Sequence, residues 1–233
     1  MSESTLAGKS AVVTGGSRGI GRHIARALHE AGASVVITGR NETTLRQSAE
    51  QIGCHFVACD QRDPAAIDAM AARVRQDHGE PDILVNNAGL VRRAAVTEMS
   101  LEDWRTVLET NLTGVFLTTK AFLPGMIARE RGDIFMISSM SGKRGDPGGC
   151  AYNASKFGLQ GFAQAVNYDV RQHNIRVMVL NPSSVDTSDE PGAAHGHGVF
   201  LHAADLAATV VHLAALPGRT LVRDMDIWGT NPP

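Results

Sequence analysis

The sequence predicts an α/β fold, in which a single doubly wound, parallel sheet of about seven strands carries helices on both faces. The first observation behind this prediction is that short apolar runs alternate along the chain with longer amphipathic segments, a pattern typical of parallel strands joined by helices. The second is size, because 233 residues, 43% of them hydrophobic, are enough for one such domain with a large core. No repeat, low-complexity segment or linker divides the chain, so we expect one domain over residues 1–233.

Three strands are predicted in the first half of the chain, and a helix follows each of them. The strands are the apolar runs at 10–14, 34–38 and 54–59. Apolar residues recur every three or four positions over 20–32, which predicts the first helix. The second helix begins at Asn41 or Glu42, and the third follows Asp63, which can act as an N-cap ahead of Pro64.

Four more strands are predicted in the second half of the chain. They are the runs at 82–87, 133–139, 175–180 and 221–227. The sequence also predicts helices at 101–130, 151–173 and 201–216. The last of the four strands can close the sheet.

Composition argues against several classes of partner and site. The net charge of −2 gives no broad basic surface for nucleic acid or a membrane. The amino-terminal residues lack the apolar run of a signal peptide, and no apolar stretch approaches the roughly 20 residues of a membrane helix. Three cysteines, an odd number without zinc-type spacing, indicate free thiols in a reducing cytoplasm. His195 and His197 have no third ligand at a recognisable spacing, so we expect no metal site.

The segment TGGSRGIG at 14–21 is a candidate phosphate-binding turn. It lies between the first predicted strand and the first predicted helix, and its glycines form the pattern G-x-x-x-G-x-G. Glycines permit a tight turn and let backbone N–H groups approach a pyrophosphate, and the helix N-terminus adds positive potential. The predicted cofactor-binding residues of this turn are Gly15, Ser17, Arg18, Gly19, Ile20 and Gly21.

The end of the second predicted strand indicates which dinucleotide binds. An acidic residue there would hydrogen-bond the adenosine ribose and favour NAD. This chain has Thr38-Gly39-Arg40 instead. Arg40 can pair with a 2′-phosphate and Arg18 can approach the same group, so we predict NADP(H) rather than NAD. The alternative is that both arginines are solvated.

Several motifs in order resemble those of the short-chain dehydrogenase/reductase family, and the resemblance covers nearly the whole chain. They are TGGSRGIG (14–21), CDQRD (59–63), NNAG (86–89), Asn111, ISS (137–139), YNASK (152–156) and NPSSVDT (181–187). The resemblance implies a Rossmann-type domain and a dinucleotide-dependent oxidoreductase. Relatives are often dimers or tetramers built on two long helices, so it also implies a homodimer or homotetramer built on 101–130 and 151–173.

The resemblance implies further contacts to the cofactor. Asp60 would hold the adenine amino group, with Gln61 beside it in the same motif, and Asn87 would lie beside the ribose. Val185 and Thr187 would meet the nicotinamide carboxamide. Alternatively, Asp60, Val185 and Thr187 are loop residues without a cofactor contact, and Asn87 is a turn residue at the end of a strand.

Tyr152 and Lys156 form the predicted catalytic pair. They lie four residues apart on one face of a predicted helix, and the resemblance implies that both point into the active site. A nearby ammonium favours the phenolate and lowers the tyrosine pKa from about 10, and positive charge on an oxidised nicotinamide would act the same way. Tyr152 would then protonate a carbonyl oxygen as hydride arrives. The alternative is an exposed helix pair.

Two further catalytic residues follow from the resemblance. Ser139, thirteen residues before Tyr152 as in the family, would orient the carbonyl oxygen, unless it only caps the strand end. Asn111 would hold a water that links Lys156 to solvent, unless it marks a helix kink or is a buried polar residue. One departure from the family is Ser183, which stands where glycine is usual and constrains the backbone more than glycine does.

The sequence predicts where the substrate binds but not what it is. The pocket is expected at the carboxyl ends of the fourth to sixth strands, whose loops contain Arg92, Arg93, Lys143 and Arg144. These basic residues either attract an anionic substrate or are solvated charges at the rim. The glycine-containing segment 188–198 suggests a flexible lid over a small or medium substrate.

Three functional hypotheses remain open at this point. The leading one is an NADPH-dependent carbonyl reductase, or the reverse alcohol dehydrogenase, with an NAD-dependent alcohol dehydrogenase as a variant. The second is a 3-oxoacyl thioester reductase, whose carrier-protein partner would need Arg129, Arg131 or Arg171 to cluster near the pocket. The third is a nucleotide-sensing binding module without catalysis, and the intact catalytic set argues against it.

Overall fold

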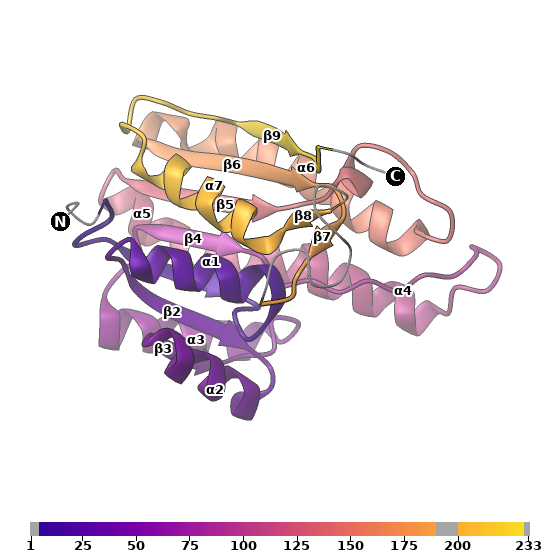
Figure 1. Ribbon diagram of the computed structural model, residues 1–233, viewed down its shortest axis with the longest axis horizontal. Helices are drawn as coiled ribbons and strands as arrows, with labels where there is room; N and C mark the ends of the chain where they lie inside the picture. Colours follow the sequence, from indigo (N-terminus) through magenta and orange to yellow (C-terminus); the bar gives the residue numbers. More distant parts are fainter. Residues whose placement is uncertain (1–4, 190–199, 231–233) are drawn as a thin grey trace.

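Seven parallel strands form one continuous sheet at the centre of the molecule (Figure 1). The structure is a computed structural model, which describes residues 5–189 and 200–230. The strands lie in the order β3-β2-β1-β4-β5-β6-β9, and every pairing is parallel. Their bounds are β1 Ser10–Thr14, β2 Ser34–Gly39, β3 His55–Ala58, β4 Ile83–Asn86, β5 Gly132–Ile137, β6 Ile175–Pro182 and β9 Asp224–Ile227. The predicted fold class is confirmed.

The strand order explains why the fold is doubly wound. From β1 the chain moves outward through β2 to β3, then crosses back to β4 on the other side of β1 and continues outward to β9. The helices are α1 Gly19–Glu30, α2 Glu42–Ile52, α3 Pro64–His78, α4 Leu101–Leu108, α5 Gly114–Ala128, α6 Cys150–Val170 and α7 Ala203–Ala215. Asp63 caps α3 as predicted, and Asn41 caps α2, whose first residue is Glu42; each side chain accepts a backbone N–H of the first turn.

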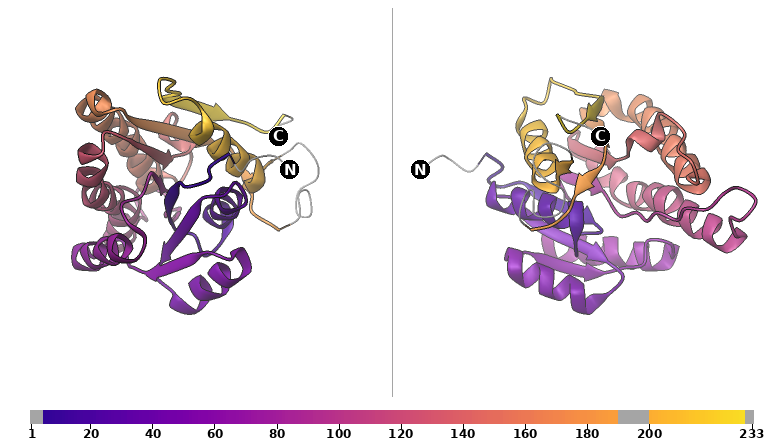
Figure 2. Two further views of the ribbon diagram at one scale, coloured as in Figure 1. Left: turned by 90° about the vertical axis from the view of Figure 1, so that its left-hand side faces the viewer. Right: turned by 45° about the vertical axis from the view of Figure 1, so that its right-hand side comes forward.

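Two hydrophobic layers hold the helices on the sheet. On one face α1, α2 and α7 contribute buried residues such as Leu28 and Val210, and on the other α3, α5 and α6 contribute residues such as Phe122 and Leu159. The helices α1 and α7, far apart in the sequence, lie side by side (Figures 1 and 2). Because both faces are covered, all of β4 is buried, which explains why the strands appear in the sequence as continuous apolar runs.

The predicted helix over 101–130 is interrupted in the structure. The helix α4 ends at Leu108, a π-helical turn η1 spans Glu109–Thr113, and α5 begins at Gly114. A π-helical turn changes the backbone hydrogen bonds from i+4 to i+5, and apolar periodicity does not reveal such a change. Two short 3₁₀ turns, η2 Met140–Gly142 and η3 Arg171–His173, follow β5 and α6.

The predicted helix over 201–216 begins two residues later than expected. Leu201–His202 is a short strand, β8, which pairs in parallel with β7 Val185–Asp186. The His202 side chain then accepts the backbone N–H of Ala204, while the carboxylate of Asp205 accepts the backbone N–H of His202. This reciprocal capping box fixes the start of α7 at Ala203.

Three negative expectations concern membranes, disulfides and metals. In the described part of the chain, no helix is both long and apolar enough to cross a bilayer. Cys54, Cys59 and Cys150 are free thiols. Residues 5–189 and 200–230 contain no group of three His, Cys, Asp or Glu side chains that could hold a metal ion. His195 and His197 lie outside the described residues.

Candidate active site

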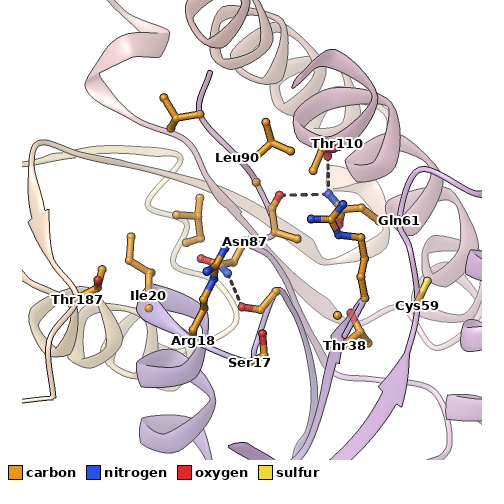
Figure 3. A pocket seen from close by; sticks show the side chains of 18 of the residues that line it. Ser17, Arg18, Ile20, Thr38, Cys59, Gln61, Asn87, Leu90, Thr110 and Thr187 are labelled. Carbon is orange, nitrogen blue, oxygen red and sulfur yellow. Dashed lines mark hydrogen bonds between the residues drawn. The ribbon is translucent and has the colours of Figure 1, made fainter. Parts of the chain in front are cut away.

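A cleft of about 350 Å³ opens where the carboxyl ends of β1, β2 and β4 meet. At this point the chain changes from one side of the sheet to the other, which is where such folds bind ligands. Figure 3 shows Ile20 and Thr187 on one side of the cleft and Gln61 and Cys59 on the other. The predicted site residues that line it are Gly15, Ser17, Arg18, Gly19, Ile20, Arg40, Asp60, Gln61, Asn87, Tyr152, Lys156 and Thr187.

The glycine turn has the geometry that its sequence predicts. Gly15 and Gly19 have positive φ angles of 68° and 56°, and a Cβ on Gly15 would lie 2.8 Å from the Cα of Ala88. Gly21 does not line the cleft. A Cβ there would lie 2.4 Å from the carbonyl oxygen of Gly15, so this glycine acts by letting α1 pack against the turn.

The amino terminus of α1 faces the cleft without a side-chain cap. Arg18 occupies the N-cap position in an extended conformation, and its side chain accepts no hydrogen bond from the helix. The first turn of α1 also carries no acidic residue. Its backbone N–H groups and the positive end of the helix dipole are therefore available to an anion. The structure thus fits the pyrophosphate of a dinucleotide at this end of the cleft.

Two arginines border the same end of the cleft. Arg18 and Arg40 are exposed, and neither forms an ion pair with any residue in the described ranges. Asp60 lies near them, but its carboxylate accepts hydrogen bonds from the guanidinium of Arg62, with a shortest distance of 2.7 Å. These bonds, together with the positive charge of Arg40, hold the pKa of Asp60 below its usual value. The predicted adenine contact of Asp60 stays a prediction.

Asn87 and Gln61 hold the loops that shape the cleft. The backbone N–H groups of Asn87 and Ala88 both donate to the hydroxyl of Thr14 at 3.0 Å, and the Asn87 side chain donates to the Thr14 carbonyl at 2.9 Å. Gln61 donates to the carbonyl oxygens of Ala88 and Thr110 (Figure 3). Both residues line the cleft, so the structure gives each a structural role at the place where a cofactor role was predicted.

The structure brings together Ser139, Tyr152 and Lys156 as predicted. Tyr152 lies in the first turn of α6, and Ser139, two residues after the end of β5, is close enough to lower the pKa of its phenol. The Nζ of Lys156 donates to the carbonyl oxygen of Ile137 at 2.7 Å and lies 5.7 Å from the centre of the Tyr152 ring. Lys156 is only 5% exposed, so the alternative of a solvated helix pair is wrong.

The predicted direction of the tyrosine pKa is wrong for this structure. Burial raises the pKa of Tyr152, and the side chain of Ser139 and the positive charge of Arg93 only partly offset that rise. Lys156 is itself desolvated, and burial lowers the pKa of its ammonium to about 8. The prediction counted the charge of Lys156 but not the burial of the phenol. Burial therefore outweighs the influences that favour the phenolate of Tyr152.

Asn111 lies in the π-helical turn and holds the loop after β4. Its Oδ1 accepts the backbone N–H of Leu90 at 2.8 Å, and its Nδ2 donates to the Leu90 carbonyl at 2.9 Å and to the Ser155 hydroxyl at 3.1 Å. The side chain is 1% exposed, so it is the buried polar residue that the alternative described. Its predicted link through water to Lys156 stays a prediction.

The segment after β6 reaches the cleft through Thr187. Thr187 lines the cleft beside Gly19, whereas Val185 lies in β7 and is not among the lining residues. Ser183 is not strained, because its φ is not positive and its backbone N–H donates to Ile227 at 2.8 Å. The family glycine is therefore not required here. Most of the predicted lid, residues 190–198, falls outside the described residues.

Three of the four basic residues near the predicted substrate pocket have partners. Arg92 pairs with Asp103 at 3.3 Å, Lys143 pairs with Asp224 and Asp226 at 2.9 and 2.6 Å, and Arg144 stacks over Trp228 at 5.1 Å. These partners come from α4, from β9 and from the residue after β9. Arg93 is the fourth, and its guanidinium donates only to the carbonyl oxygen of Pro147, at 3.2 Å, within the described ranges.

Sequence analysis missed a polar chain that ends at the cleft. Ser138 lines the cleft, and its hydroxyl accepts a hydrogen bond from Gln160 at 3.2 Å. Gln160 also donates to Asn181, whose side chain donates to Asp226 at 3.0 Å. Gln160 lies four residues after Lys156 on α6 and thus on the same helix face, which is the one signal in the sequence that could have indicated it.

Comparison with known proteins shows which protein family this chain resembles. The family profile described as short chain dehydrogenase matches residues 9–194. The 3-oxoacyl-(acyl-carrier-protein) reductase FabG of Escherichia coli strain K12 is 38% identical over 182 residues, which cover 77% of this chain and 75% of that protein.

Two solved structures are similar over almost the whole chain. A metagenomic short-chain oxidoreductase in complex with NADP is 35% identical with a TM-score of 0.85, covering 96% of this chain and 97% of that one. An alcohol dehydrogenase from the archaeon Thermococcus sibiricus, complexed with 5-hydroxy-NADP, is 27% identical with a TM-score of 0.88, covering 97% and 98% of the two chains.

Proposed function

The chain belongs to the short-chain dehydrogenase family, and on that premise we propose that it is an NADP(H)-dependent oxidoreductase that interconverts a carbonyl and a secondary alcohol. One observation carries this proposal. A phenol with a serine side chain near it and a buried lysine beside it lies in the same cleft as an uncapped helix amino terminus. Reduction adds one hydride and one proton to the carbonyl and yields the alcohol and the oxidised dinucleotide. The bound dinucleotide supplies the hydride, and this chain supplies the proton.

Tyr152 is the proposed proton donor. Its raised pKa keeps the phenol protonated near neutral pH, which is the form that reduction requires. Ser139 would hydrogen-bond the carbonyl oxygen and hold it beside the phenol. Oxidation of an alcohol requires the phenolate instead, so the reverse reaction should need a higher pH. The burial of Tyr152 therefore keeps available at neutral pH the protonated form that donates to the carbonyl oxygen.

Lys156 is proposed to orient the cofactor and to exchange a proton with Tyr152. One ammonium hydrogen is fixed by the Ile137 carbonyl, and the other two are left for the ribose hydroxyls that the family resemblance implies. Its lowered pKa of about 8 lets this group gain and lose a proton near operating pH, which suits acid–base chemistry.

The preference for NADP over NAD is part of the proposal. The end of β2 carries Arg40 and no acid, and Arg18 lies at the same end of the cleft. Neither guanidinium has a carboxylate partner in the described ranges, so both are available to a 2′-phosphate. The similarity to two chains whose structures contain an NADP or a modified NADP supports the same choice.

A 3-oxoacyl thioester reductase is the second candidate function. It is favoured by the 38% identity to a 3-oxoacyl-(acyl-carrier-protein) reductase. The predicted docking arginines do not support it, because Arg129 and Arg131 both pair with Asp82, which precedes β4 at the edge of the sheet away from the cleft. Arg171 stacks on Tyr168 at the far end of α6.

Self-association through α5 and α6 is also proposed. Phe116 on α5 and Phe157 and Tyr168 on α6 are large apolar side chains that are 44%, 47% and 59% exposed. A homodimer or homotetramer built on these helices would cover them. Light scattering of the purified protein should give a mass of two or four chains, and a monomer at micromolar concentration would contradict this part of the proposal.

The test of the proposed function is loss of NADPH absorbance with a panel of ketones, aldehydes and 3-oxoacyl thioesters. Tyr152→Phe removes only the hydroxyl, so it should lower the rate by roughly 100- to 10,000-fold, the usual contribution of a general acid, while NADPH binding is kept. If both proteins bind NADPH and neither oxidises it with any substrate, the sensor hypothesis is favoured and the proposed enzyme activity is rejected.

A further inference from the structure

Arg93 lies in the loop after β4, two residues beyond Val91 of the cleft lining, and the fold leaves its charge without a counter-ion in the described residues. The other three basic residues of the loops after β4 and β5 are committed to Asp103, to Asp224 and Asp226, and to Trp228. No carboxylate in residues 5–189 or 200–230 lies within ion-pair distance of Arg93. The side chain is exposed, so its charge is accessible to a ligand.

The backbone fixes Arg93 close to the catalytic tyrosine. The next residue, Ala94, forms a parallel bridge with Gly149, and its N–H donates to the Gly148 carbonyl at 3.0 Å. Arg93 donates through Nη1 to Pro147 at 3.2 Å. Pro147 to Gly149 lead directly into α6, whose third residue is Tyr152. The loop after β4 is therefore tied to the segment that positions the phenol.

Electrostatics support the same placement. The positive charge of Arg93 lowers the pKa of Tyr152, and this influence is larger than the opposing influence of the Asp146 carboxylate. Arg93 therefore lies close enough to the phenol for its charge to be felt there. Asp146 has one oxygen committed to the Ser141 hydroxyl, and it does not pair with Arg93.

We propose that Arg93 binds a carboxylate of the substrate, so that the enzyme acts on oxo acids and the corresponding hydroxy acids. This inference rests on the proposed function. A guanidinium has five N–H donors in a planar fork that matches a carboxylate, and Pro147 uses one of them. Carboxylate is favoured over phosphate because the nearby Asp146 would repel a dianion more strongly than a monoanion.

The experiment compares matched substrates that differ only in charge. The probes are pyruvate and acetoacetate, the methyl ester of each, and dihydroxyacetone phosphate, all assayed with NADPH. The wild-type protein should have a higher kcat/KM for one of the acids than for its ester. Arg93→Ala should lower kcat/KM for that acid by roughly 10- to 100-fold, the range for loss of a charge-assisted pair, and should change the value for the ester less than threefold.

Two matched controls isolate the charge of Arg93. Arg92→Ala removes the neighbouring arginine, which is paired with Asp103, and should leave the acid-to-ester ratio of kcat/KM unchanged. Arg93→Lys keeps the charge but not the planar fork, so it should recover part of the preference for the acid. The dissociation constant for NADPH should be the same in all four proteins.

A binding measurement separates failure of this inference from failure of the proposed function. Butanoate and butanamide are titrated calorimetrically into the complex with NADP⁺, where no turnover occurs. Butanoate should bind at least tenfold more tightly to the wild-type protein than to Arg93→Ala, and butanamide should not distinguish them. The inference is overturned if butanoate binds equally to both proteins, or if an ester or the phosphate is a better substrate than both acids. In either case, reduction of neutral ketones would still support the proposed function. If butanoate binding depends on Arg93 but the protein reduces no substrate, the proposed function is rejected and the anion-binding site is kept.

Discussion

The two edges of the sheet use arginine in opposite ways. At the amino edge, Arg176 makes two hydrogen bonds to the carboxylate of Asp133, at 2.6 and 2.7 Å, and Arg129 and Arg131 share Asp82. At the carboxyl edge, Arg18, Arg40, Arg93 and Arg144 have no carboxylate partner within the described ranges, and of these four Arg144 stacks over Trp228. The difference indicates which charges belong to the fold and which are left for ligands.

This contrast has a physical basis. A buried charge without a partner is costly, so a guanidinium that is 8% exposed, such as that of Arg176, must be neutralised by the fold itself. An exposed arginine at the rim of a cleft keeps its hydration and needs no partner until an anion arrives. The presence or absence of a carboxylate partner therefore helps to tell a structural arginine from one that is available to a ligand.

The largest effect should come from breaking the buried pair at the amino edge. Asp133→Asn leaves Arg176 charged and buried without its counter-ion, so the free energy of unfolding should fall by about 3–5 kcal/mol. Denaturant unfolding measures this change, and Asp77→Asn in the exposed pair with Arg73 should cost less than about 1 kcal/mol. The proposed difference between the two edges is contradicted if Asp133→Asn alters NADPH affinity and leaves the free energy of unfolding unchanged.

A smaller effect, on binding alone, is expected at the carboxyl edge. Arg40→Ala removes an unpaired guanidinium, so NADPH binding should weaken by about 2 kcal/mol, or roughly thirtyfold, while NADH binding changes little. Calorimetric titration with both dinucleotides measures the two affinities. Unfolding should be unaffected, because the fold does not use this charge. Equal losses for NADPH and NADH would show that Arg40 does not read the 2′-phosphate.

The sequence predicted the elements that depend on local patterns. The strands were found because sheets covered on both faces need continuous apolar runs, and Asn41 and Asp63 act as caps through contacts a few residues away. A kink at Asn111 was named only as an alternative, because the break of the helix at 109–113 accompanies contacts of Asn111 with Leu90 and Ser155. Those contacts join segments that are distant in the sequence.

Most of the predicted site residues line the cleft, but the electrostatics of the site could not be predicted from the sequence. The proposed catalytic residues were chosen from motif spacing, but whether Arg92 or Arg93 is neutralised depends on where α4 places Asp103. Lys143 is neutralised by β9, which becomes a neighbour only when the sheet closes. The tyrosine pKa was predicted in the wrong direction because burial, the larger influence, is a property of the whole fold.

Lys156 sharpens the comparison, because its charge is buried at the carboxyl edge and has no carboxylate partner among residues 5–189 and 200–230. Its pKa falls from 10.5 to about 8, so below pH 8 the charged form costs the folded state about 3 kcal/mol, at 1.36 kcal/mol per unit. The unfolded chain binds more protons than the folded one between about pH 8 and 10.5, so stability from this group rises with pH across that window.

Lys156→Met should therefore inactivate the enzyme and yet stabilise it at pH 7. The gain should be about 1–2 kcal/mol, because loss of the hydrogen bond to Ile137 offsets part of the recovered desolvation cost. Denaturant unfolding at pH 7 and pH 10 measures the difference, which should shrink or change sign at the higher pH, where the wild-type lysine is neutral in the folded state. A variant that is less stable at pH 7 by as much as Asp133→Asn would mean that this lysine is a structural charge like those of the amino edge.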